Sequence, residues 1–277
     1  MARPEAPDGT AGTPSLLVER EGAVVVVTMN RPARKNAMSL EMLGLLAEAW
    51  TEIDADDSVR CAILTGSGSS YCVGGDLATG WMAKGYQPAN DAERRVIAEP
   101  GLIGNALLLT YWLRTPLIAA VNGACLGGGC EMLQQTDVRV AEEQATFGLP
   151  EVSRGLIPGA GSTMRLKRQI PYAIAMEMLL TGRILDAEEA LRWGLVNHVV
   201  PTGTGLARAR EIAEVVCGHG PLAVAEAKAS AVETGWEREE LVQAIESRHA
   251  AVVSRSADAK EGMRAFTERR PPRFEGR

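Results

Sequence analysis

Residues 116–132 read PLIAAVNGACLGGGCEM, and this stretch decides the fold that we expect. An apolar run typical of a buried strand ends at Asn122-Gly123, and three glycines, Gly127–Gly129, then stand just before Cys130 and Glu131. Glycine at a strand end permits unusual backbone angles and lets a ligand approach backbone N–H groups. The stretch therefore predicts a strand, a glycine-rich turn and a helix that carries a carboxylate.

A second glycine cluster, GSGSSYCVGGDL at 66–77, also follows an apolar run, CAILTG at 61–66. If helices begin near Gly75 and Gly128, their first N–H groups have no partner within the helix. Two such N–H groups aimed at one point form an oxyanion hole. The alternative is that both glycine clusters only permit tight turns between strands and helices.

Two glutamates lie in glycine-rich, apolar surroundings. Glu131 follows the triple glycine, and Glu151 lies in the segment FGLPE at 147–151. Desolvation raises the pKa of a carboxyl group toward neutrality, which suits general acid–base catalysis. The alternative is that each is an ordinary carboxylate at a helix end or in a loop.

Composition excludes several classes of protein. The chain has 277 residues and a net charge of −6, which disfavours nucleic acid as a partner. It contains no apolar run of 18 residues and no apolar segment of a secretory signal near its start, so we expect neither membrane insertion nor export. Its five cysteines form no CxxC pair, which favours free thiols in a cytoplasmic protein.

Other familiar sites are absent from the sequence. Neither glycine cluster contains GxGxxG, and no GK[ST] or GxSxG occurs, which disfavours nucleotide loops and serine hydrolases. The three histidines stand apart and match no metal-ligand spacing, so we expect no metal and no separate cofactor.

Periodicity along the chain predicts an α/β protein. We expect a hairpin at 15–29, a helix from Ser39, and an irregular loop followed by a helix between 77 and 115. Further strands are predicted at 61–66, 116–123, 137–141 and 145–147. The pattern then becomes helical, at 162–169, 172–181, 187–193, 205–217, 221–233, 237–251 and 256–268. Strands alternating with helices, followed by helices alone, indicate an α/β core with a helical C-terminal part.

Ordered motifs from about residue 15 onward resemble the enoyl-CoA hydratase/isomerase (crotonase) superfamily. The matching segments are Asn30-Arg31-Pro32 with Lys35-Asn36-Ala37, Tyr71–Leu77, Asn122–Glu131, Phe147–Gly161, Leu179–Arg183, Trp193–Val196 and Glu261–Phe266. The resemblance implies a ββα spiral core at 15–200 and a helical trimerisation region at 201–277. The N-terminal sequence itself, MARPEAPDGTAGTP, predicts a flexible leader at 1–14. The resemblance also implies a homotrimer or a dimer of trimers.

The resemblance assigns roles within the site. It implies that the N–H groups of Gly75 and Gly128 hold the oxygen of a coenzyme A thioester, and that Glu131 and Glu151 are the catalytic carboxylates. Because hydratases carry both carboxylates, it favours addition of water across C2=C3 of a 2-enoyl-CoA. Glu131 would act mainly as base and Glu151 would protonate C2.

The resemblance also implies contacts with the acyl-CoA substrate. These residues are Arg34, Lys35, Ala37, Gly74, Asp76, Leu77, Leu126, Gly127, Pro150, Phe266 and Arg269. Phe266 and Arg269 match positions that reach the coenzyme from the next subunit, and Arg31, Arg34 and Lys35 match a segment beside the nucleotide. The alternative for each charge is a solvated surface position.

Some segments depart from the family pattern. Tyr71 and Gly75 replace the usual Phe and Ala, and Gln134-Gln135-Thr136-Asp137 replaces a more apolar helix end. The segment 78–100 has no clear counterpart. We expect this segment to line the acyl pocket. A wide, apolar pocket that suits a bulky acyl group could be formed by Trp81, Met82, Tyr86, Leu107 and Trp112.

Other reactions of the same fold stay open. A Δ3,Δ2-enoyl-CoA isomerase needs one carboxylate as a proton shuttle, and a hydrolase or dehalogenase needs other residues, such as Asp or His, near the thioester. A non-catalytic scaffold that binds coenzyme A would be expected to lose Glu131, Glu151 or the glycines, and all are present.

Overall fold

The computed structural model describes residues 13–82, 85–219, 221–235, 254–255 and 257–270. Almost all of the predicted leader and the predicted helix at 237–251 lie outside these residues. Within the described part of the chain, no helix is both long and apolar enough to cross a membrane.

The larger of two sheets has six strands in the order β1-β2-β3-β5-β7-β10. β1 and β2 form the predicted antiparallel hairpin, and every later pairing in this sheet is parallel. The strand bounds are β1 Leu16–Glu21, β2 Val24–Met29, β3 Cys61–Gly66, β5 Leu117–Val121, β7 Val138–Glu142 and β10 His198–Val200.

Both faces of this sheet are covered, which explains why the central strands β3 and β5 are buried at every position. In β3, Ala62 and Leu64 face the main core, whereas Cys61 and Ile63 face a second, smaller cluster. Helix α8 (Gly205–Cys217) supplies Ala209 and Ala213 to that second cluster. Small alanines allow α8 to lie close to the sheet.

The second sheet is short and carries both glycine clusters. Its strands are β4 (Ser70–Cys72), β6 (Ala124–Leu126), β8 (Thr146–Gly148) and β9 (Ile184–Asp186). β4, β6 and β8 are parallel neighbours, so the segments that follow them emerge at the same edge. This pairing brings residues 73–77, 127–131 and 149–154 together.

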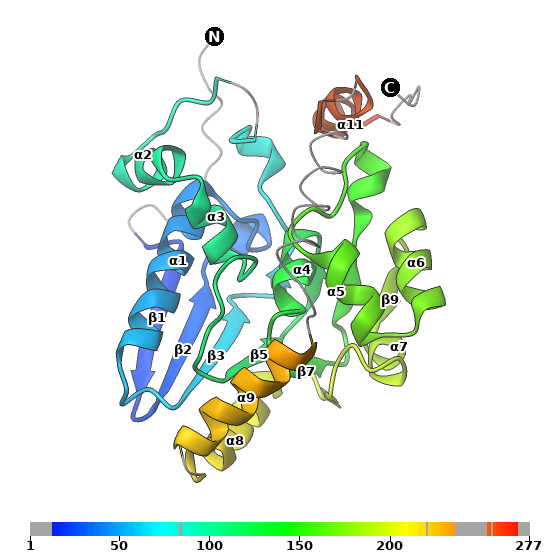
Figure 1. The fold of residues 1–277 in the computed structure, drawn as a ribbon. Coiled ribbons are helices and arrows are strands. Elements are labelled where there is room, and N and C mark those ends of the chain that lie inside the picture. The colour runs from blue at the N-terminus through cyan, green and yellow to red at the C-terminus, as the bar shows by residue number, and fades with distance from the viewer. Residues whose placement is uncertain (1–12, 83–84, 220, 236–253, 256, 271–277) are drawn as a thin grey trace.

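Helices surround the two sheets, as Figure 1 shows. Ser39 caps α1 as predicted, since its hydroxyl accepts a hydrogen bond from the Met42 N–H. The remaining helices are η1 Pro32–Arg34, α1 Leu40–Ala55, η2 Leu77–Thr79, α2 Asp91–Ala98, α3 Gly101–Ala106, α4 Gly128–Leu133, η3 Pro150–Arg154, α5 Ser162–Gln169, α6 Tyr172–Thr181, α7 Ala187–Arg192, α9 Pro221–Gly235 and α11 Ala257–Thr267.

Three expectations need correction. The part of the chain after residue 160 is not purely helical, because β9 and β10 are strands of three residues, too short to show an alternating pattern. No α-helix begins near Gly75; a single 3₁₀ turn, η2, begins two residues later at Leu77. The segment between 77 and 115 holds two short α-helices, α2 and α3, where the sequence predicted one.

Candidate active site

The two glycine clusters meet backbone to backbone. A Cβ atom added to Gly74 would lie 3.0 Å from the Gly128 nitrogen, and one added to Gly127 would lie 3.7 Å from the Gly74 Cα. Gly74 and Gly127 also have positive φ angles of 89° and 54°. Glycine is needed at both positions because any side chain would strain the backbone and separate the two turns.

Two backbone N–H groups are left unused where these turns meet. Among the described residues, the N–H groups of Gly75 and Gly128 donate no hydrogen bond within the protein. Met38 pairs with the residues on either side of Gly75, because its N–H bonds to the Gly74 oxygen and its oxygen accepts from the Asp76 N–H. The Gly75 nitrogen lies 4.0 Å from the Cβ position of Gly128.

Glu131 lies in the first turn of α4 and is buried, with 3% of its surface exposed. Its Oε1 accepts hydrogen bonds from the backbone N–H groups of Ala160, at 2.8 Å, and Ser162, at 3.2 Å. These donors stabilise a negative charge in a place that water does not reach freely. The segment IPGAGS at 157–162 thus forms a cradle for this carboxylate.

Glu151 lies in η3 with its carboxylate beside the glycine turn. Its Oε1 lies 3.0 Å from the Cβ position of Gly127, and its buried Oε2 has no hydrogen-bond partner. Burial raises the pKa of Glu151 to about 7, and the charge of Arg154 opposes that rise only in part. A carboxyl group of this kind can both give and take a proton near neutral pH.

Asp76 is the centre of a cluster at the other side of the turn. Its carboxylate, 3% exposed, accepts from Arg31 at 2.9 Å and from Arg34 at 3.1 Å, and it caps η2. Arg34 is therefore half-buried and paired, whereas Lys35 is exposed with a φ of 51°. Nearby, Ala37 is buried and Leu77 half-buried.

Helix α11 packs on the segment that carries Glu151. Gly262 lies so close to the Arg154 backbone oxygen that a Cβ atom would not fit, so the helix and η3 are in direct backbone contact. The Arg154 guanidinium lies 4.9 Å from the centre of the exposed Phe266 ring. Arg269 is exposed as well. Phe266 is thus placed beside the glutamate segment of its own chain; a contact across subunits stays a prediction.

Two further predicted substrate-binding residues border the glycine turn. Leu126 ends β6, paired with Gly148, and is half-buried. Pro150 is the first residue of η3, where its fixed φ suits the turn.

The residues predicted for the acyl pocket separate into two groups. Trp81 and Met82 both come within 3.4 Å of the Cβ position of Gly75, so they border the unused N–H groups. Tyr86 instead bonds Glu93, and Leu107 is buried in the main core.

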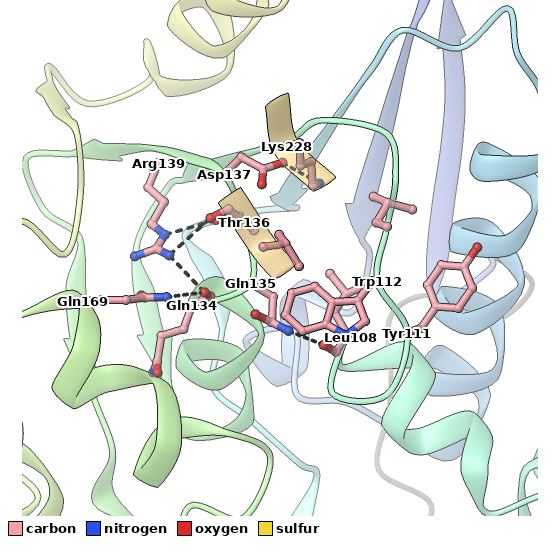
Figure 2. A pocket seen from close by; sticks show the side chains of 12 residues that line it. Leu108, Tyr111, Trp112, Gln134, Gln135, Thr136, Asp137, Arg139, Gln169 and Lys228 are labelled. Atoms are coloured by element: carbon pink, nitrogen blue, oxygen red, sulfur yellow. Dashed lines mark hydrogen bonds and ion pairs between the residues drawn. The ribbon is translucent and has the colours of Figure 1, made fainter. Parts of the chain in front are cut away.

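Trp112 lies at a different pocket, of about 140 Å³, drawn in Figure 2. That pocket lies at the C-terminal end of α4 and is lined in part by the ion pair of Lys228 and Asp137. Neither candidate glutamate is among the residues that line it.

Sequence reasoning missed the residues that support the two glutamates. Arg154 and Ala160 lie within the family motif at 147–161 and Ser162 begins the helix predicted at 162–169, but the sequence pattern assigns no role to any of them. The run of glycines at 155, 159 and 161 was the available signal, because Gly161 has a φ of 120° and lies against Arg165.

Comparisons with known proteins identify the family of this chain. A profile described as enoyl-CoA hydratase/isomerase matches residues 19–277. Enoyl-CoA hydratase EchA19 of Mycobacterium tuberculosis is 46% identical over 264 residues, 95% of this chain and 97% of that protein.

Solved structures give the same result. A provisionally assigned enoyl-CoA hydratase/isomerase from Mycobacterium abscessus is 57% identical with a TM-score of 0.72, covering 95% of this chain and all of that one. Carnitinyl-CoA hydratase from Mycobacterium avium is 36% identical with a TM-score of 0.85, covering 96% of this chain and all of that one. The chain belongs to the enoyl-CoA hydratase/isomerase family.

Proposed function

We propose that this protein is an enoyl-CoA hydratase, which adds water across the C2=C3 bond of a 2-enoyl-CoA thioester to give a 3-hydroxyacyl-CoA. The observation that carries the proposal is the pair of buried carboxylates beside two unused N–H groups. Glu131 is held by two N–H donors, and burial raises the pKa of Glu151 to about 7.

In the proposed reaction the thioester oxygen accepts hydrogen bonds from the N–H groups of Gly75 and Gly128. Glu131 takes a proton from water while the water oxygen forms a bond to C3. The electrons of the double bond move toward the thioester oxygen, and Glu151 gives its proton to C2. The N–H groups stabilise the enolate because its negative charge develops on the oxygen that they contact.

The neighbouring residues would bind the rest of the substrate. Arg154 and the exposed Phe266 and Arg269 lie where a phosphate or adenine group can meet positive charge and an aromatic ring. Exposed Lys35 offers another cation, whereas Arg34 is already paired with Asp76. We further propose that the protein acts in the cytoplasm as a homotrimer or a dimer of trimers, without a separate cofactor.

The test follows loss of the conjugated enoyl-thioester absorbance with a short and a bulky 2-enoyl-CoA. The wild-type protein should consume at least one substrate, and Glu131→Gln and Glu151→Gln should each lower kcat by several orders of magnitude while binding of coenzyme A persists. If the wild type leaves every 2-enoyl-CoA unchanged but converts a 3-enoyl-CoA to the conjugated product, the protein is an isomerase. Inactivity toward both classes would disprove the proposal.

A further inference from the structure

A pair of buried polar side chains joins the end of α4 to the start of α5. Gln134 is 2% exposed and Ser162 is fully buried. The Gln134 Nε2 donates to the Ser162 Oγ at 2.7 Å and to the Cys130 oxygen at 3.1 Å. Among the described residues the Gln134 Oε1 has no partner, so only the two Nε2 bonds offset the cost of burying this amide.

Ser162 connects this pair directly to Glu131. Its side chain accepts from Gln134, while its own backbone N–H donates to the Glu131 Oε1. Gln134 also lies one turn after Glu131, and its N–H bonds to the Glu131 oxygen at 3.2 Å. The carboxylate, its cradle and the amide therefore form one hydrogen-bonded ring between two helices.

Gln134 is itself fixed from the opposite side. Its backbone oxygen accepts from Arg139 at 3.1 Å and from Gln169 at 2.7 Å, as Figure 2 shows. Arg139 is buried and also donates to the Thr136 and Leu195 oxygens. The amide is thus attached to a rigid support, and movement of Ser162 relative to α4 would break its bond.

We propose that Gln134 and Ser162 are positioning residues, whose side-chain hydrogen bond holds the 160–162 segment against α4 and so keeps the Glu131 carboxylate oriented for proton transfer. The inference rests on the proposed function in assigning that proton transfer to Glu131. It also gives a role to Gln134, which departs from the apolar residue expected at this helix end. Neither side chain touches the substrate; both act through Glu131.

The test compares Gln134→Met with Gln135→Met. Methionine has a similar length and removes the amide, and Gln135 is a matched control because its Nε2 bonds the Leu108 oxygen and not Ser162. With a 2-enoyl-CoA, Gln134→Met should lower kcat about 10- to 100-fold with KM changed less than about twofold, since a small misplacement of a catalytic group has such an effect. Gln135→Met should stay within about twofold of the wild type in kcat, and an equal loss in both variants would overturn the proposal.

A second variant and a second readout separate this inference from the proposed function. Ser162→Ala should resemble Gln134→Met, and the double variant should lose no more than the worse single one, because both remove the same bond between Gln134 and Ser162. If the losses in kcat of the two single variants multiply in the double variant, the proposal is wrong. Amide hydrogen exchange of Ala160 and Ser162 should be faster in Gln134→Met than in the wild type and Gln135→Met. If amide exchange is unchanged in Gln134→Met, the proposed role of the Gln134–Ser162 hydrogen bond is wrong, whatever the activity. If exchange is faster in Gln134→Met but the wild-type protein is inactive, only the proposed hydratase function is contradicted.

Discussion

The carboxylate of Glu151 lies directly against Gly127: a Cβ atom added to this glycine would be 3.0 Å from the glutamate Oε1. Gly127 is also the residue that precedes α4, with a φ of 54°. One residue therefore sets both the start of the helix that carries Glu131 and the space beside Glu151.

Gly127→Ala should abolish most activity. The new methyl group is strained by the positive φ and meets the Glu151 carboxylate. Gly203→Ala is the matched control, because Gly203 has a φ of 83° and nothing within 4 Å of its Cβ position. Gly203→Ala should lose about 1–2 kcal/mol of unfolding free energy in urea because of its positive φ. Gly127→Ala should lose more, because its methyl group also meets the Glu151 carboxylate. Only Gly127→Ala should also lose at least about tenfold in kcat; equal activities would show that the contact is unimportant.

Glu151 should make the protein less stable as the pH rises. Its pKa is raised from 4.5 to about 7 by burial, so the folded state binds the proton more tightly than the unfolded state. The contribution of Glu151 should therefore lower the unfolding free energy by up to about 3 kcal/mol between about pH 4.5 and pH 7. Above pH 7 this contribution should stay constant.

Glu151→Gln should remove that dependence. Urea unfolding at pH 5 and pH 8 should show the variant more stable than the wild type at pH 8 only. Glu214→Gln, at an exposed position of α8, is the control and should follow the wild type. The raised pKa of Glu151 would be contradicted if the unfolding free energy of the wild type rose from pH 5 to pH 7 and Glu151→Gln had no effect on it.

Arg154 should tune the pH dependence of activity. Its positive charge lowers the pKa of Glu151 against the effect of burial. Arg154→Met should therefore move the limb of the pH–kcat profile that reports Glu151 to higher pH. Phe266→Leu removes the ring that Arg154 stacks on but keeps the charge. Its profile should keep the wild-type midpoint; a shift of equal size in both variants would exclude a charge effect.

Asp76 should stabilise the fold through its two arginines. In Asp76→Asn the capping side chain remains, but Arg31 and Arg34, 11% and 29% exposed, lose their charged partner. The unfolding free energy should fall by about 2–3 kcal/mol, as expected for a largely buried pair. Asp57→Asn breaks the exposed pair with Arg114 and should cost less than about 0.5 kcal/mol. Similar costs in urea denaturation would refute this difference.

Local patterns in the sequence predicted much of the fold. The hairpin at 15–29 and the Ser39 cap were confirmed, and α5, α6 and α8 have the predicted bounds. These features depend on residues close together in the chain: alternation, capping hydroxyls and glycine turns. β9, β10 and the two helices between 77 and 115 could not be predicted, because short elements carry too little periodicity and are fixed by their neighbours in space.

By itself the sequence determined which residues have the chemistry and which turns need glycine: Glu131, Glu151, and the clusters at 66–77 and 122–131. The tertiary structure alone decided that Gly74 touches Gly128, that Ala160 and Ser162 bind the Glu131 carboxylate, and that Gln134 holds Ser162. These contacts join segments about 30 or more residues apart. The physical reason is that desolvation and hydrogen bonding depend on what packs around a group, and that is set only when distant segments of the chain meet.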